Sequence, residues 1–295
     1  PPSQSRRPPP TPTLRRSRRQ RQMCIRDRIY EALGEDDQAL VSYRKAMDVY
    51  IATANEQLIT VPEMLQMDLL RLLADQGLRD EYRKLKSEFG LANFTPAELG
   101  DEYGELIVIL NNGLAPIREE AAIMTFSPEV QSNVRIAFPV YKYESAPVNN
   151  ARLKTSEKLF YLETVENIDR LARQALDEDM PLVMARAVTR AVVKYQSQKS
   201  AQEQHALAGF LLTVTNLATE RADTRSWTTL PQEIQMTRVV LPVGQQDVSI
   251  EIVNAAGRVI DSIDTSVNIL PRQHSFLTRH WIAPVPVKTY IANSK

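Results

Sequence analysis

Residues 29–50, IYEALGEDDQALVSYRKAMDVY, decide the fold of the N-terminal third of the chain. Gly34 is suited to ending one helix, because glycine readily adopts the left-handed conformation found at helix C-termini. The acidic residues 35–37 place negative charge where the next helix begins, which its dipole favours. In that second helix the small and aromatic residues recur at spacings of four and three and share one face: Ala39, Tyr43 and Ala46. The stretch therefore predicts a closely packed helical hairpin.

This hairpin resembles a tetratricopeptide repeat, in which the second helix carries alanine followed four positions later by an aromatic residue. The resemblance implies helices that bind a protein partner, and it makes Tyr30 and Tyr43 candidate partner-binding residues. A weaker unit follows over residues 62–90, with a leucine-rich helix, a break at Gly77 and a return helix. An ordinary helical hairpin is the alternative for both units. We assign residues 29–95 to an N-terminal helical region of this kind.

The N-terminus has a different character. Residues 1–22 are rich in proline, arginine, serine and glutamine, and such a segment buries too little apolar surface to order itself. Residues 18–28, RRQRQMCIRDR, match at every position the translation of a sequencing-library transposon adapter. We therefore interpret residues 1–28 as disordered and adapter-derived, in preference to a basic arm for nucleic acid or anionic lipid. The adapter-like residues replace the beginning of the first helix of the repeat. We therefore expect the remaining end of that helix to fray over residues 29–33.

Composition narrows the class of protein. The chain has 295 residues, 43% of them hydrophobic, which is enough to bury a sizeable core. Nine arginines and one aspartate in residues 1–28 carry the positive charge, so the remainder is acidic and does not suggest a nucleic-acid surface. No apolar run reaches the roughly 18–20 residues that span a bilayer. The only cysteine, Cys24, lies in the adapter-like segment, so no disulfide or thiolate ligand is expected elsewhere.

Residues 96–295 are predicted to form a mixed domain, with strands within 104–141, helices within 156–221 and strands within 235–283. The run GELIVIL at 104–110 precedes Asn111-Asn112-Gly113, a strong tight-turn signal. Helices are expected over 159–176 and, after an acidic interruption at 177–179, from Pro181 onward. Their second apolar stripe comprises Leu182, Ala185, Val188, Val192 and Tyr195.

The last quarter alternates short apolar runs with turns, which predicts a β-meander forming one layer of a sandwich. The predicted fold class is α+β: tetratricopeptide-like hairpins, then antiparallel strands and amphipathic helices, then the meander or sandwich. The apolar stretch 205–218 is predicted to be a buried helix rather than a membrane contact, because it is too short to span.

The search for catalytic chemistry yields no known motif. Two of the three histidines, His274 and His280, share a face of one predicted strand but lie roughly 20 Å apart, too far for one metal ion. The carboxylate clusters at 119–120 and 177–179 are explained as solvated faces or helix caps. We therefore predict no catalytic residue, no metal ligand and no cofactor, and a protein that is not an enzyme. A hydrolase without a motif, using His205 with Glu220 or Asp223, is an alternative.

The segment ADTRSWTTLPQEIQ at 222–235 joins the helices to the last strands. Arg225 and Trp227 alternate along an extended stretch and should project to one side, as a recognition patch would require: arginine for a carboxylate or phosphate, tryptophan for stacking. The alternative is a buried junction in which Trp227 fills the seam between helix and sheet, while Arg225 pairs with Asp223 or Glu220.

Taken together, these segments resemble an uncharacterised family of bacterial tetratricopeptide-bearing envelope proteins, many of them lipoproteins. The resemblance covers most of 29–295 and lies in the hairpin at 29–50 and in four further segments: GELIVILNNGLAPIREE, ARAVTRAVVKY, ADTRSWTTLPQEIQ and VLPVGQQDVSIEIVNAAGRVI. It implies a periplasmic, non-enzymatic scaffold or adaptor that binds proteins through its helices and does not bind nucleic acid. Any association with the outer membrane would require a lipid anchor ahead of residue 29. A small-ligand or glycan-binding module at 222–235 is the alternative.

Overall fold

The computed structural model describes residues 28–57, 61–96, 99–127, 132–141, 149–204 and 221–283. They belong to two compact units, each assembled from separate parts of the chain. The ribbon unit contains the described residues between 115 and 141, between 168 and 204, and between 221 and 230. The sandwich unit contains the rest. The chain is a mixed α+β protein, as predicted, but the division differs from the expected boundary at residue 95, because the N-terminal helices and most strands share one unit.

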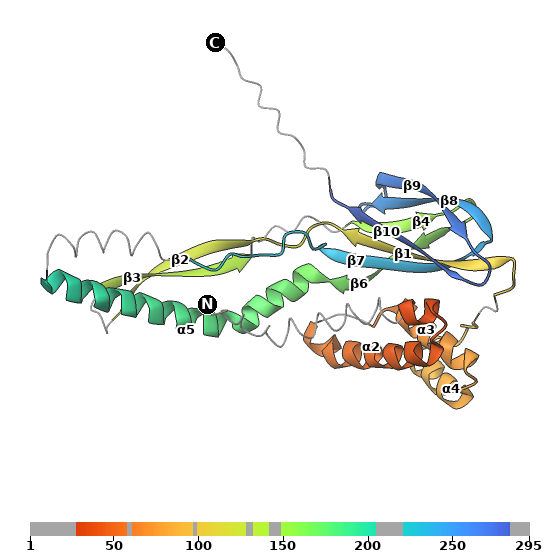
Figure 1. Cartoon of the computed structure of the whole chain (residues 1–295), viewed down its shortest axis with the longest axis horizontal. Helices are drawn as coiled ribbons and strands as arrows, with labels where there is room; N and C mark the ends of the chain where they lie inside the picture. The colour runs from red at the N-terminus through yellow and green to blue at the C-terminus, as the bar shows by residue number, and fades with distance from the viewer. Residues whose placement is uncertain are drawn as a thin grey trace, which may run out of the picture. The chain divides into compact units, whose positions relative to one another are not determined.

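The sandwich unit holds two four-stranded sheets, which Figure 1 shows stacked on one another. The first sheet has the order β10-β1-β7-β6 and comprises β1 (Tyr103–Asn112), β6 (Glu163–Asn167), β7 (Glu233–Pro242) and β10 (His274–Trp281). The second has the order β5-β4-β8-β9 and comprises β4 (Asn150–Lys154), β5 (Leu159–Tyr161), β8 (Gly244–Val253) and β9 (Val259–Ile269). All pairs are antiparallel except β1 with β10, which is parallel.

Alternating apolar residues of the two sheets form the core between them. Side chains on alternate positions of a strand point to the same face, so each strand contributes every second residue. The members with no exposed surface are Leu106, Val108, Leu110, Ala151, Leu153, Ile250, Ile252 and Ile269. The buried indole of Trp281 joins this core and donates a hydrogen bond from Nε1 to Asp261 Oδ2 at 2.7 Å. The expectation of a sandwich is therefore confirmed.

The helices of the sandwich unit are a helical turn at residues 28–32, α2 (Asp36–Gln57), α3 (Glu63–Asp75) and α4 (Arg79–Glu88). Gly34 has a φ of +73° and allows the bond from Glu35 N to Tyr30 O at 2.8 Å, which closes the first helical turn. The predicted face of α2 is confirmed, because its small and aromatic members are at most 1% exposed: Ala39, Tyr43 and Ala46. Residues 28–32 are helical and Arg28 is 2% exposed, so neither the expected fraying of this segment nor the expected disorder as far as residue 28 is observed at these positions.

The ribbon unit is built from two long strands and one long helix. β2 (Arg118–Ser127) pairs antiparallel with β3 (Ser132–Tyr141), and α5 (Ile168–Gln204) packs against β3 (Figure 1). The first three buried residues of α5 are spaced by three and four positions, as one helical face requires. The described residues that α5 buries are Ile168, Leu171, Ala175, Leu176 and Ala187.

Two predictions about the helices were wrong. The expected helix from residue 156 does not begin until Ile168, because β5 and β6 occupy much of the preceding stretch. The short apolar runs of this stretch fit the period of a helix as well as that of a strand. They form strands because β5 pairs with β4 and β6 pairs with β7. The expected restart at Pro181 is also wrong, since α5 continues through this proline. Proline removes one helical hydrogen bond and bends a helix, and Figure 1 shows α5 changing direction along its length.

The predicted stripe of α5 faces outward in the described part. Leu182 is 51% exposed and Val188 is 41% exposed, whereas Ala187 is fully buried. Side chains of 192 and 195 lie outside the described set, as do residues 1–27, His205 and the apolar stretch 205–218.

The predicted connections between strands also need correction. Asn111 and Asn112 form no hairpin turn but complete β1, whose neighbours are β7 and β10. The C-terminal strands do not form a meander, because β7 and β10 enter the first sheet while β8 and β9 enter the second. Among the described residues, no helix has both the length and the apolar character needed to cross a membrane.

Candidate functional site

Charged side chains gather beneath the helices of the sandwich unit, where these helices meet the first sheet. We call this group the buried ionic cluster: Arg28, Glu31, Tyr43, Asp68, Arg71, Glu105, Arg238 and His274. The helices supply the first five and the strands β1, β7 and β10 supply the last three. Charged groups are rarely buried without partners, so such a concentration marks either a functional centre or a structural link.

Arg238 on β7 is the hub of the cluster. Its Nε lies 3.0 Å from Glu105 Oε1, and its Nη1 lies 2.9 Å from Asp68 Oδ1 and 3.2 Å from Glu31 Oε2. Its Nη2 also donates to both glutamates, so one guanidinium contacts all three carboxylates. Arginine suits this position because its planar guanidinium presents several donors in fixed directions. Burial alone would lower the pKa of Arg238, but the carboxylates outweigh it and raise this pKa well above its ordinary value.

The helices contribute further donors to the same carboxylates. Arg28 Nη2 lies 2.8 Å from Asp68 Oδ2, and Arg71 donates to Glu31. The hydroxyl of Tyr43 donates to Glu31 Oε2 at 3.0 Å. Each of the three carboxylates therefore accepts at least two hydrogen bonds, as a buried carboxylate requires.

The surroundings keep the glutamates ionised. Burial would raise the pKa of Glu31, but the charges and hydrogen bonds of Arg238 and Arg71 lower it from 4.5 to about 2. Burial would likewise raise the pKa of Glu105, but hydrogen bonds from His274 and Arg238 hold it far below its usual range. Burial and the adjacent Asp68 raise the pKa of the Tyr43 hydroxyl, so this group stays a neutral donor.

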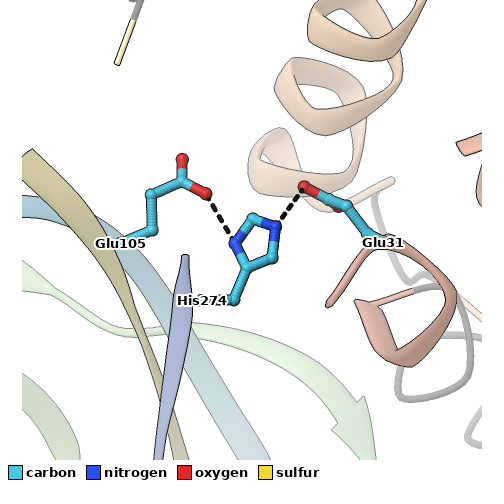
Figure 2. Close-up of side chains that lie close together, drawn as sticks. All are labelled: Glu31, Glu105 and His274. Carbon is cyan, nitrogen blue, oxygen red and sulfur yellow. Dashed lines mark ion pairs between the residues drawn. The ribbon is translucent and has the colours of Figure 1, made fainter. Parts of the chain in front are cut away.

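Glu31, Glu105 and His274 form the one set of three described residues with the spacing of metal ligands (Figure 2). Their ligand atoms all lie within 4.8 Å of one another. His274 stands between the two carboxylates, with Nδ1 2.7 Å from Glu105 Oε2 and Nε2 3.5 Å from Glu31 Oε1. The position that a cation would take next to both carboxylates is already served by Arg238, which also lies 3.4 Å from His274 Nδ1. Bringing in a divalent ion would place two cationic groups side by side, so the residues fit a metal poorly.

The arrangement is suited to holding elements together rather than to acid–base catalysis. Three arginines oppose three carboxylates, and each carboxylate is committed to charged donors. A general acid or base instead needs a pKa near the working pH, and the pKa values of both glutamates are shifted away from it. The cluster therefore links the helices to the first sheet at one defined position.

The residues predicted for partner binding are divided between the two units. Tyr43 is fully buried inside the ionic cluster, and Tyr30 is partly buried against the helical core. Both belong to the sandwich unit, whereas Arg225 and Trp227 belong to the ribbon unit. Tyr43 is thus inaccessible to a partner and supports the helices from within.

The junction residues lie at the surface of the ribbon unit. Trp227 is 63% exposed and donates from Nε1 to Thr229 Oγ1 at 2.8 Å, so it does not fill a seam as the alternative interpretation required. Arg225 pairs with Asp223, with Nη2 2.7 Å from Oδ2, as that alternative did predict. His205 and Glu220, proposed for a hydrolase, lie outside the described residues.

The cluster was missed because its members are far apart in sequence. Two signals existed: Glu105 is the only charged residue of β1, and Arg238 directly precedes the apolar run 239–241 of β7. An isolated charge at a core-facing position demands a partner of opposite sign, but the chain offers many candidates. Comparison of the chain with models of protein families, with curated proteins and with solved structures found no match.

Proposed function

We propose that this chain is a non-enzymatic scaffold or adaptor of the bacterial cell envelope, which binds a protein partner through tetratricopeptide-like N-terminal helices. The observation that carries the proposal is the buried ionic cluster. It commits the carboxylates of Glu31, Asp68 and Glu105 to arginines and fixes the helices on a β-sandwich. A binding surface that is held rigid in this way loses little entropy when a partner docks.

The outer surface of these helices offers a contact site. Ile29 is 47% exposed and Leu33 is 67% exposed, and they lie one helical turn apart. Val41 on α2 adds a third apolar side chain, 43% exposed. Side chains four positions apart lie on the same helical face, so Ile29 and Leu33 form an apolar stripe of the kind that receives a partner helix or peptide. We assign partner binding to this stripe in place of Tyr43, which is buried.

A photo-crosslinking residue placed at Leu33 in the intact gene product tests this proposal directly. The matched control carries the same residue at Leu270, an exposed leucine of the same unit that lies after β9. We expect one discrete protein adduct, enriched in envelope fractions, from position 33 and none from position 270. Equal labelling at both positions, or an adduct confined to cytoplasmic fractions, would contradict the proposal. Fractionation of the same samples tests the periplasmic location and any lipid anchor.

A second candidate is a small-ligand or glycan-binding module at residues 222–235. The exposed indole of Trp227 favours it, because its Nε1 is held by Thr229 and its ring faces solvent. Such a ring can stack on a sugar. Titration with soluble cell-wall oligosaccharides should quench Trp227 fluorescence in this case. The variant Trp227→Phe should lose binding, whereas Trp281→Phe should retain it, since Trp281 is buried in the other unit.

A further inference from the structure

The ribbon unit contains a cavity of about 600 Å³ between α5, the β2–β3 ribbon and the start of the junction segment. This volume lies within the range typical of pockets that bind small molecules, about 300–1,000 Å³. Its walls are contributed by three separate parts of the chain that belong to one unit: α5, strands β2 and β3, and residues 222–223. None of these walls belongs to the helices or to the buried ionic cluster of the sandwich unit.

Three arginines line the cavity: Arg118 at the start of β2, and Arg186 and Arg190 on α5. The two helical arginines are four positions apart, so they lie on the same face of α5. Tyr141 holds the guanidinium of Arg118 in place. Arg118 Nε donates a hydrogen bond to the Tyr141 hydroxyl at 3.1 Å, and Arg118 Cζ lies 5.5 Å from the centroid of the Tyr141 ring. Arg186 forms no ion pair with any residue that the structure describes, so its charge is available to a ligand.

The acidic residues of the cavity wall do not cancel this positive charge. Asp223 accepts hydrogen bonds from Arg225 Nε at 2.8 Å and Nη2 at 2.7 Å, and this partner neutralises it from outside the cavity. Hydrogen bonds from Arg225 hold the pKa of Asp223 down at about 2. One further carboxylate, Asp179, also lines the cavity. Arg118 and Arg186 therefore face one carboxylate without such a partner, Asp179, so this part of the cavity carries a net positive charge.

The rest of the wall is apolar. Ala137 and Pro139 of β3 face Leu176 and Val183 of α5. The proline lies in a paired strand opposite Glu120 and lacks a backbone N–H, so it offers a ligand only apolar surface at that point of the wall. A cavity with arginines on one side and apolar groups on the other suits a ligand with a charged head and an apolar body.

We propose that this cavity binds a small amphipathic organic anion, with its carboxylate or phosphate head on Arg118 and Arg186 and its apolar body against Leu176 and Val183. Arginine binds both kinds of head through paired N–H donors, so the shared chemistry is the anionic head. The site is independent of the proposed partner surface, and it differs from the glycan candidate because neither Arg225 nor Trp227 lines it.

Isothermal titration calorimetry of the full chain with octanoate and with octyl phosphate tests the proposal. We expect saturable one-to-one binding of at least one probe, and the tighter of the two identifies the preferred head. Octanol lacks the charge and inorganic phosphate lacks the apolar body, so both should bind at least tenfold more weakly. Binding should also weaken as the salt concentration rises.

Arg186→Gln removes one charge and should weaken binding of the tighter probe by about tenfold or more. Val183→Phe fills the apolar end and should weaken octanoate binding without removing charge. The control Arg258→Gln removes an arginine from the exposed turn between β8 and β9 and should leave the affinity unchanged. Unchanged thermal unfolding would show that each variant is folded. Absence of binding for both probes, or equal affinity in wild type and Arg186→Gln, would overturn the proposal.

Discussion

Arg238 Nη1 lies 3.2 Å from Glu31 Oε2, although 207 positions separate the two residues in the chain. This contact joins the first helical turn to the centre of the first sheet. Because the same guanidinium reaches Asp68 and Glu105, a single side chain connects two helical segments and two strands. Replacing either partner of such a buried pair leaves the other charge uncompensated, so the cluster should dominate the stability of the sandwich unit.

Substituting the hub should strongly destabilise the sandwich unit. Arg238→Met retains an unbranched chain but leaves three buried carboxylates without their common donor, and we expect unfolding free energy to fall by about 3–5 kcal/mol. Urea unfolding in a Trp227→Phe background isolates the signal of Trp281, which is 6% exposed within this unit. The exposed Arg258→Met serves as control and should change little. A loss below about 1 kcal/mol for Arg238→Met would contradict the importance of the cluster.

Stability should depend on pH in the acid range. The pKa of Glu31 is lowered from 4.5 to about 2 on folding, so its ionised form stabilises the protein above the unfolded value. This contribution, on the order of 3 kcal/mol, should be lost as pH falls from about 4.5 towards 2. Unfolding measured at intervals from about pH 7 to about pH 3 should show this decline.

Glu31→Gln should make the acid decline shallower, because one titrating group is gone while Glu105 remains, and its stability at neutral pH will be lower. The control Glu157→Gln alters an exposed carboxylate and should keep the wild-type slope. If Glu31→Gln declined with pH as steeply as wild type, the lowered pKa of Glu31 could not be the cause.

A single methyl group at Gly104 should disturb the first sheet. A Cβ at this position would meet the carbonyl oxygen of Leu270 in severe overlap and would lie 2.8 Å from Cγ2 of Ile269. Backbone cannot yield as a flexible side chain does, so Gly104→Ala should cost about 1–3 kcal/mol or more. Gly100→Ala is the matched control, with no heavy atom within 4 Å and no unusual φ. Equal melting temperatures for the two variants would show that the strand and its neighbouring turn can separate freely.

Removing the Tyr43 hydroxyl distinguishes a role of Tyr43 in the stability of the helices from a role in partner binding. Tyr43→Phe deletes the 3.0 Å hydrogen bond to Glu31 while keeping the ring in the helical core, and a bond to a charged group contributes about 1.5–3 kcal/mol. We expect a loss of that size in thermal or urea unfolding, with crosslinking at Leu33 preserved. Tyr103→Phe, at a tyrosine 43% exposed, should have almost no effect. Loss of the crosslinked adduct without loss of stability would instead indicate that Tyr43 takes part in partner binding.

Local patterns were sufficient for several elements. The face of α2 carrying Ala39, Tyr43 and Ala46 is buried as its spacing indicated, and Gly34 and Gly77 both end helices with positive φ. Val248, Ile250 and Ile252 alternate along one of the apolar runs of the last quarter, and all three residues line the sandwich core. These features depend on the period of a helix or strand and on glycine's conformational freedom, which neighbouring residues alone determine.

Short apolar runs were ambiguous between helix and strand, because the period cannot be read from so few residues. The stretch from residue 159 to residue 167 fits either period over so few positions, and only its pairing with β4 and β7 made it β5 and β6. Pro181 lies inside α5, although proline usually ends a helix, and Ala187, which follows it on α5, is fully buried. Local propensity is a weak preference that tertiary contacts of this kind override.

By itself, then, the sequence determined the α+β class, the buried face of α2 and the identity of most strands, since each follows from residues close together in the chain. Only the tertiary structure decided that β1 pairs in parallel with β10, that the last strands divide between two sheets, and that Glu31, Glu105 and Arg238 meet. The physical reason is that a charge inside an apolar strand requires a partner but does not specify which one. That choice depends on where the whole chain places each side chain, and so does the arginine-lined cavity of the ribbon unit.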